Sequence, residues 1–237
     1  EKGVDGFRLD VINYISKTSL EDGNETLGAL LGFTGIEHYF YGDRLHEYLR
    51  EIRARAFKDA FTVGETPGTG PAMNQLLTAD ERGELNTVFS FDHLENQGKG
   101  RFDDYRYNLN HLKKCFIGYE SAYADVAWPS IFVENHDNPR MVSKIDDREE
   151  ARDMVANLLA VLLFTARGTV FLYQGQELGA INAPFTSLTE LRDIESLNKY
   201  KELVEAGTTP QAALKTVLGG TRDHARTPMQ WTGAPDG

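Results

Sequence analysis

Three short stretches decide the fold: GFRLD at 6–10, FTVGE at 61–65 and FVENHD at 132–137. Each is an apolar, β-rich run that leads into a carboxylate. Short apolar runs of this kind are typical of buried strands in a parallel sheet. A parallel α/β barrel brings the C-terminal ends of its strands to one face, where its chemistry lies. The three stretches therefore predict three acids that point into one shared mouth.

The composition is that of a globular protein with an acidic balance. The chain has 237 residues, 41% hydrophobic and 26% charged, with a formal net charge of −11 and no basic stripe. This argues against nucleic acid and anionic membrane surfaces as partners, and solubility is the simplest explanation of the acidity. Cys115 is the single cysteine, which fits a reducing compartment, and we expect a cytoplasmic location. No apolar run is long enough to span a membrane.

Strand patterns alternate with helical patterns along the chain. We expect five strands at about 4–10, 59–65, 86–92, 128–135 and 168–174. A helical face is predicted at Leu45, Tyr48, Leu49, Ile52 and Ala56, and another at Met154, Leu158, Val161 and Leu162 within an apolar helix over roughly 147–166. Two further helical pieces follow at 196–206 and 209–219. This alternation predicts a parallel sheet with right-handed crossovers.

A family resemblance rests on longer versions of the same stretches. GFRLDVINYISK at 6–17, FTVGETPG at 61–68 and FVENHDNPR at 132–140 resemble three signature regions of the α-amylase family of glycoside hydrolases, in family order. The tail TRDHARTPMQW at 221–231 is similar to a segment of the oligo-1,6-glucosidase and dextran glucosidase branch. The resemblance implies a TIM (β/α)8 barrel, of which the five expected strands would be strands four through eight.

Five strands do not close a barrel that needs eight. We therefore expect residues 1–237 to be a partial catalytic barrel domain, with the first three strands upstream and the family's all-β domain downstream, both absent. We expect this piece to be inactive by itself. The resemblance implies no cofactor in this part of the barrel, and a calcium site, if the protein has one, would lie upstream.

Three carboxylates are the candidate catalytic residues. The resemblance implies that Asp10 is the nucleophile, Glu65 the general acid and base, and Asp137 the acid that stabilises the oxocarbenium-like transition state. Arg8 lies two residues before Asp10 on the same strand face, so its guanidinium would orient the carboxylate and lower its pKa. Glu65 needs a raised pKa, which a nearby ionised Asp10 and a partly dry pocket would give. A structural Arg–Asp pair and a turn-capping Glu are the alternatives.

Other residues are candidates for binding the substrate. By the resemblance, His136 would donate to hydroxyls of the same sugar ring as Asp137, and Val11 accompanies a preference for α-1,6 over α-1,4 linkages. Arg140, Arg222 and Arg226 would hold the acids or a sugar hydroxyl, with a structural salt bridge as the equal alternative for each. We expect no metal site, since His136 and Asp137 lack a third and fourth ligand at a usual spacing.

The sequence thus predicts a retaining glycoside hydrolase that releases glucose from the non-reducing end of α-1,6-linked gluco-oligosaccharides through a covalent glycosyl-enzyme. An α-1,4-glucosidase and a sucrose isomerase of the same family would carry the same three acids. A non-catalytic relative, such as a transporter partner subunit, would be expected to lack at least one of them. The expected partner is a small oligosaccharide, and the full protein is expected to be a monomer or weak oligomer.

Overall fold

The computed structural model describes residues 3–233, which form two compact units. The first unit comprises the chain up to Asp92 together with Ile117–Ser130 and Arg167–Thr169. The second unit comprises His93–Phe116, Ile131–Ala166 and the chain from Val170 onward. Each unit is described separately below.

A three-stranded parallel sheet is the centre of the first unit. Strands β1 (Gly6–Leu9), β2 (Phe61–Glu65) and β3 (Thr87–Phe89) lie in that order. The register pairs Gly6 with Phe61 and Leu9 with Gly64, so β1 and β2 end side by side. Residues 62–65 of the central strand are all buried, as expected for a strand with neighbours on both sides.

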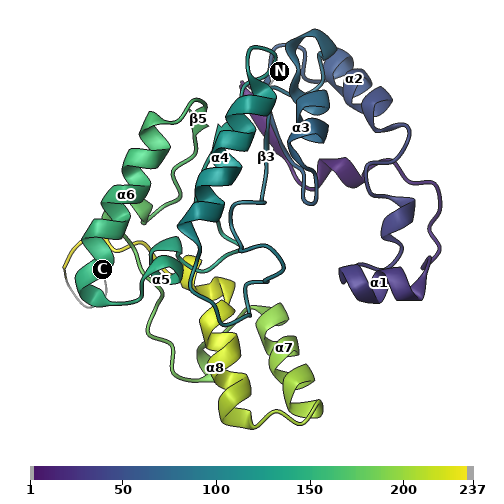
Figure 1. Ribbon diagram of the computed structural model, residues 1–237. Coiled ribbons are helices and arrows are strands. Elements are labelled where there is room, and N and C mark those ends of the chain that lie inside the picture. The colour runs from purple at the N-terminus through teal and green to yellow at the C-terminus, as the bar shows by residue number, and fades with distance from the viewer. Residues whose placement is uncertain (1–2, 234–237) are drawn as a thin grey trace. The chain divides into compact units, whose positions relative to one another are not determined.

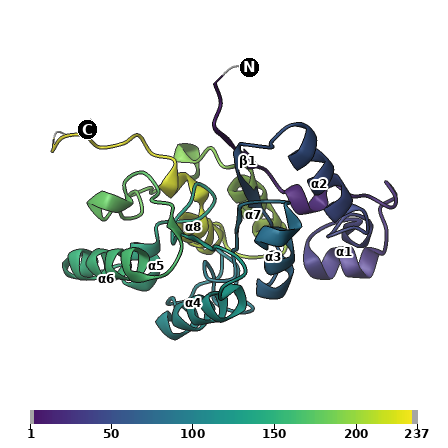
Figure 2. The same cartoon turned by 90° about the horizontal axis from the view of Figure 1, so that it is seen from above.

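Three helices belong wholly to this unit: α1 (Glu25–Leu31), α2 (Leu45–Arg55) and α3 (Pro71–Thr78). Figure 2 shows α2 and α3 beside β1. Short 3-10 helices occupy Ile12–Tyr14, Ile36–His38 and Asp80–Arg82. The predicted face of α2 is buried at Leu45 and Leu49, which join Ile12, Leu77, Leu85 and Val88 in one apolar cluster. That cluster lies directly against the strand that carries Glu65.

Gly64 shows how tightly the cluster packs under the end of β2. A β-carbon at this position would lie 2.7 Å from Leu85 Cδ1 and 2.9 Å from Ile12 Cγ2. Both distances are below normal carbon–carbon contact, so only glycine fits without moving its neighbours. The backbone immediately before Glu65 is therefore held between two buried side chains.

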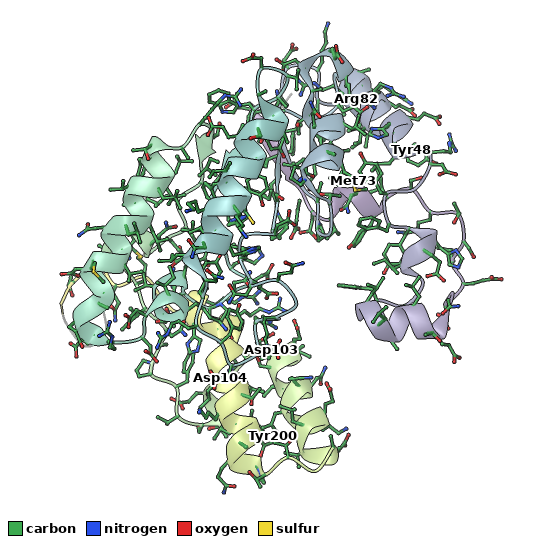
Figure 3. All side chains as sticks on the ribbon, in the orientation of Figure 1. Tyr48, Met73, Arg82, Asp103, Asp104 and Tyr200 are labelled. Atoms are coloured by element: carbon green, nitrogen blue, oxygen red, sulfur yellow. The ribbon has the colours of Figure 1, made fainter. Side chains whose placement is uncertain are left out.

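A buried charge cluster fastens α2 to the segment that leads into β3. The Glu84 side chain is fully buried and accepts from Arg50 Nη1 at 3.0 Å and Arg82 Nη2 at 2.9 Å. His46 Nδ1 lies 2.6 Å from the other carboxylate oxygen. Arg82 is labelled in Figure 3, among the side chains around α2 and α3. Because a buried carboxylate needs such partners, the cluster fixes the approach to β3.

The second unit is mainly helical. Its helices are α5 (Met141–Ile145), α6 (Arg152–Thr165), α7 (Ile194–Glu205) and α8 (Pro210–Gly220), with 3-10 helices at Glu149–Ala151, Gln176–Leu178, Leu188–Glu190 and Arg222–Ala225. The long helix α4 (Leu109–Tyr123) and the paired strands β4 (Ser130–Ile131) and β5 (Thr169–Val170) contribute residues to both units. Figure 1 shows α7 and α8 lying against each other, as their contacts require.

The sequence of α7 and α8 explains where each begins. Asp193 caps α7 by accepting the backbone N–H groups of Glu195 and Ser196. Thr209 caps α8, and Pro210 takes the first helical position. Acceptor side chains at the cap and proline at the first turn are the usual start signals. Both helices lie within two residues of their predicted bounds.

The expected apolar face of α6 was wrong. The helix buries Val155, Leu159 and Leu163, whereas Met154, Leu158 and Val161 are exposed. The helix is apolar on two sides, so its periodicity did not indicate which side packs. The prediction of the helix itself is confirmed.

A strand lies at each of the five predicted places, but all five are shorter than expected, the last three most of all. Residues Phe132, Val133 and Glu134 follow β4 as buried chain outside the strand, with a bend at Val133. No helix among residues 3–233 is long and apolar enough to cross a membrane.

Candidate active site

Asp10 and Glu65 lie at the ends of neighbouring parallel strands. Asp10 follows the last residue of β1, and Glu65 is the last residue of β2. Because Leu9 pairs with Gly64, the next residues along the chain, Asp10 and Glu65, lie at the same level. They differ in environment, since the Asp10 side chain is 72% exposed and the Glu65 side chain 11% exposed.

Arg8 binds both carboxylates. Its Nη1 donates to Asp10 Oδ1, and its Nη2 donates to Glu65 Oε2 at 2.5 Å. Burial raises the pKa of Glu65, and a hydrogen bond with Asp10 raises it further, while the Arg8 charge and the Val11 N–H act in the opposite direction. The net effect is a raised pKa. A raised pKa is what a carboxyl group needs in order to donate a proton near neutral pH.

Val11 has an uncommon backbone conformation. Its φ of 37° and ψ of 44° lie in the left-handed region, which β-branched residues rarely adopt. The turn directs its N–H toward Glu65 Oε2 at 3.4 Å and starts the 3-10 helix Ile12–Tyr14. Asn13, fully buried in this helix, donates from Nδ2 to the carbonyl of Pro67 at 3.0 Å. The chain after Asp10 is therefore tied to the chain after Glu65.

Tyr14 is a neighbour of Glu65 that the sequence analysis did not single out. Its ring meets that of Tyr39 edge-on, with centroids 5.0 Å apart. Burial raises the pKa of Tyr14, and the charges of Tyr39 and Glu65 raise it further. The motif GFRLDVINYISK contained this residue, but nothing in its spacing distinguished it from a packing aromatic.

Asp137 lies in the second unit, on the loop that follows buried residues 132–134. The side chain of Asn135 shapes this loop by accepting the Asp137 N–H at 2.9 Å and the Asn138 Nδ2 at 3.0 Å. His136 Nε2 lies 3.1 Å from Asp137 Oδ2, and its side chain is about half exposed. The pair is accessible, as a site for sugar hydroxyls requires.

Two arginines of the tail motif hold Asp137. Arg222 Nη1 and Arg226 Nη2 each donate to Asp137 Oδ1 at 2.8 Å. Arg226 Nε also donates to the carbonyl of His136 at 2.8 Å. Tyr173 Oη donates to the carbonyl of Ala225 at 2.8 Å, which fixes the tail between the two arginines. The structure therefore joins two motifs that lie far apart in the sequence.

Arg140 forms a buried salt bridge, the alternative to a substrate contact. Its Nη1 donates to Glu134 Oε2 at 3.0 Å and to the carbonyl of Gln174 at 2.9 Å. Glu134 Oε1 accepts the N–H of Met141 at the start of α5. Burial raises the pKa of Glu134 although Arg140 and the Met141 N–H act against it. This pair connects the two ends of the segment 134–140 that carries Asp137.

Sequence reasoning missed the acids and the arginine around the start of α7. Arg222 Nε lies 3.0 Å from Asp193 Oδ1, and its Nη2 pairs with Glu195. Arg101 Nη2 lies 3.2 Å from Asp193 and 2.6 Å from Glu195. In the sequence these are ordinary charged residues of a loop and a helix start, and no motif links them to Asp137.

The predicted site residues fall into two groups. Arg8, Asp10, Val11 and Glu65 come together in the first unit. His136, Asp137, Arg140, Arg222 and Arg226 come together in the second unit. That the two groups surround one sugar stays a prediction. Among residues 3–233, no three His, Cys, Asp or Glu side chains form a group that could hold a metal ion.

Comparison with known proteins gives the family. The model of the α-amylase catalytic domain matches residues 1–236. The oligo-1,6-glucosidase of Parageobacillus thermoglucosidasius is 42% identical over 237 residues, which is 98% of this chain and 42% of that protein. The chain thus spans about 42% of the length of this relative.

Solved structures agree in fold. Trehalose-6-phosphate hydrolase of Bacillus licheniformis superimposes with a TM-score of 0.84 at 36% identity, covering 98% of this chain and 42% of that one. Isomaltulose synthase of Klebsiella sp. LX3 superimposes with a TM-score of 0.87 at 31% identity, covering 99% and 43%. The fold is that of a fragment of the TIM-barrel family, as these matches indicate. On the family match and these relatives together, the chain belongs to the α-amylase family of glycoside hydrolases.

Proposed function

We propose that the protein is a retaining glycoside hydrolase that releases glucose from the non-reducing end of α-1,6-linked gluco-oligosaccharides. The observation that carries this proposal is the pair of acids on Arg8: an exposed Asp10 and a largely buried Glu65 with a raised pKa, at the ends of adjacent strands. Retaining enzymes need two carboxyl groups close together, with one protonated and one ionised. A hydrogen bond between the two groups supports the short separation.

The proposed chemistry has two steps. Asp10 attacks the anomeric carbon while Glu65 gives its proton to the departing glycosidic oxygen, which leaves a covalent glucosyl ester. Glu65, now ionised, takes a proton from water as the water oxygen attacks the same carbon, and the ester bond breaks to release Asp10. Arg8 remains bound to both carboxylates and keeps Asp10 ionised.

Asp137 is the proposed third acid. It would stabilise the positive charge that develops on the sugar ring and hold ring hydroxyls together with His136. Arg222 and Arg226 would keep its carboxylate ionised and oriented. This role requires the two units to come together around one glucose, with β1 to β5 as strands four through eight of a TIM barrel.

The α-1,6 preference rests on Val11 and on the oligo-1,6-glucosidases among the relatives. An apolar side chain beside the nucleophile offers no hydroxyl to the aglycone. Sucrose isomerisation is the second candidate, favoured by the likeness to isomaltulose synthase. That reaction would use the same glucosyl-enzyme, with the released fructose in place of water as the acceptor.

The test is turnover of isomaltose, maltose and sucrose by the full-length protein, with the anomer of the released glucose followed by NMR. We expect α-glucose to appear first from isomaltose. Asp10→Ala and Glu65→Gln should each lower kcat by several orders of magnitude. Glu47→Gln, on the exposed side of α2, is the matched control and should leave kcat unchanged. Early release of β-glucose, or normal rates from either site variant, would refute the retaining mechanism.

A further inference from the structure

The Arg222 guanidinium lies within ion-pair distance of three acids. Its Nη1 donates to Asp137 at 2.8 Å and its Nη2 donates to Glu195, while its Nε lies 3.0 Å from Asp193 Oδ1 as an ion pair without hydrogen-bond geometry. One cation therefore connects the proposed catalytic acid to two acids at the start of α7. The three acids differ in how firmly they are held.

Asp193 is the fixed one of the three. Its side chain is 4% exposed, compared with 33% for Asp137 and 54% for Glu195. It caps α7 by accepting the N–H of Glu195 at 3.2 Å and of Ser196 at 3.3 Å, and it accepts the Ser196 hydroxyl at 2.6 Å. Its own N–H donates to Asp223 Oδ2 at 2.9 Å. A carboxylate with this many partners cannot turn without breaking the helix cap.

We infer that Asp193 is a positioning residue for the reaction, which anchors Arg222 and through it sets the orientation of the Asp137 carboxylate. The inference rests on the role of Asp137 proposed above. Burial by itself would raise the pKa of Asp193, but the Ser196 hydroxyl and the charges of Arg101 and Arg222 outweigh it, and the net pKa is lowered. Asp193 is therefore ionised at neutral pH and attracts Arg222.

The anchor matters because Asp137 must accept sugar hydroxyls when a substrate binds. Its partly exposed carboxylate would do so while keeping its contact with Arg222. If Arg222 were held only by Asp137 and the exposed Glu195, its guanidinium would move whenever one of these side chains moved. Held by Asp193 as well, Arg222 stays in place, and Asp137 keeps one fixed geometry through the transition state. Such preorganisation stabilises the transition state more than the bound substrate.

Asp193→Asn in the full-length protein separates this role from helix capping. Asparagine caps helices as well as aspartate does but carries no charge to hold Arg222. With p-nitrophenyl α-D-glucopyranoside as substrate, we expect kcat to fall about tenfold, since small misplacement of a reacting group has effects of this order. KM should change less, and the melting temperature should stay close to that of the wild type. Unchanged kcat would overturn the inference.

Thr209→Ala is the matched control, because Thr209 caps the neighbouring helix α8 in the same unit. It should lower the melting temperature without changing kcat. If Asp193→Asn does not fold, Asp193→Ser takes its place, since serine also caps helices and is uncharged. A fall in kcat for Thr209→Ala as large as that for Asp193→Asn would show that loss of a cap alone explains the effect.

A double-mutant cycle with Arg222→Gln tests the route of the effect. If Asp193 acts through Arg222, adding Asp193→Asn to Arg222→Gln should not lower kcat further. If the fall in kcat of the double variant equals the product of the falls in the two single variants, the inference is overturned. Asp137→Asn keeps this test distinct from the proposed function: normal turnover there would refute the role of Asp137 itself. If kcat falls in Asp137→Asn but not in Asp193→Asn, only the positioning role of Asp193 is refuted.

Discussion

Glu65 is subject to two opposing influences. Burial and the hydrogen bond with Asp10 favour its protonated form, and Arg8 and the Val11 N–H favour the carboxylate. The first pair prevails, and the pKa is raised. A proton donor in this mechanism needs that outcome, because it must still carry its proton at the pH where Asp10 is ionised.

The raised pKa of Glu65 also predicts a penalty in stability. A carboxyl group whose pKa is higher in the folded state binds its proton more tightly there, so stability falls as pH rises above about 4.5, the ordinary value, through the raised pKa. Glu65→Gln removes this titration. Relative to the wild type, the variant should therefore gain in melting temperature on going from pH 4 to pH 7.

Calorimetry at the two pH values measures that gain. Thr209→Ala, which removes an uncharged helix cap, serves as the control and should change the melting temperature equally at both pH values. The same titration predicts that kcat of the wild type falls as pH rises through the pKa of Glu65. A loss of stability in Glu65→Gln that grows toward pH 7 would contradict the assignment.

Val11 is the second residue with a specific expectation. It follows Asp10 in a left-handed turn, so its side chain position is set by the backbone. Val11→Thr exchanges a methyl group for a hydroxyl of nearly equal size. We expect the ratio of kcat/KM for maltose to that for isomaltose to rise about tenfold, the usual scale for one such group in a substrate pocket. An unchanged ratio would remove Val11 as the origin of linkage preference.

At the scale of elements, the turn from buried chain 132–134 into α5 depends on one ion pair. Glu134 and Arg140 are both almost fully buried, with side chains 1% and 5% exposed. Arg140→Met would leave a buried carboxylate without its cation, and the free energy of unfolding should fall by about 3–5 kcal/mol. Urea denaturation measures this. Combining the change with Glu134→Gln should restore part of the loss.

The control for that measurement is Arg148→Met. Arg148 pairs with Asp146 on the surface, where solvent screens the interaction, and its loss should leave the denaturation midpoint unchanged. Equal effects of the two arginine substitutions would show that the Glu134–Arg140 pair has no special role in holding the loop.

The elements also show what the sequence could predict. The runs before Asp10 and Glu65 became paired parallel strands because each is apolar, short and followed by a turn. The packed face of α6 could not be predicted, since Met154 and Val155 belong to two apolar sides and only tertiary contacts decide between them. Tail residues 222–226 were noticed by their motif, but their contact with Asp137 depends on the chain returning over a long distance.

The residues that surround the start of α7 could not be found from the sequence. Arg101 and Asp193 are separated by 92 positions, and each alone is a common residue in a common setting. An aspartate directly before a helix is a typical cap, and Asp193 has that role in the structure. Its second contact, with Arg222, follows only from the folded arrangement. In the sequence, an aspartate that only caps a helix cannot be distinguished from one that also forms an ion pair.

At the scale of the whole molecule, the three acids belong to two units. Asp10 and Glu65 are fixed by the sheet of the first unit, and Asp137 is fixed by the arginines of the second unit. We expect a crystal structure of the full-length protein with bound deoxynojirimycin, a glucose mimic, to show all three carboxylates in contact with that one ring. Density for the ring on Asp10 and Glu65 alone, with Asp137 remote, would contradict the proposed third acid.

The order in which the chain is made gives the tail contact a further meaning. Asp137 precedes its two arginine partners by 85 and 89 positions. While a ribosome is still translating that interval, the nascent polypeptide already contains all three acids but neither Arg222 nor Arg226. The contacts of Asp137 with its two arginines can therefore form only after residue 226 has emerged from the exit tunnel. A product terminated before that point would contain every acid of the proposed reaction but not the two arginines that orient Asp137.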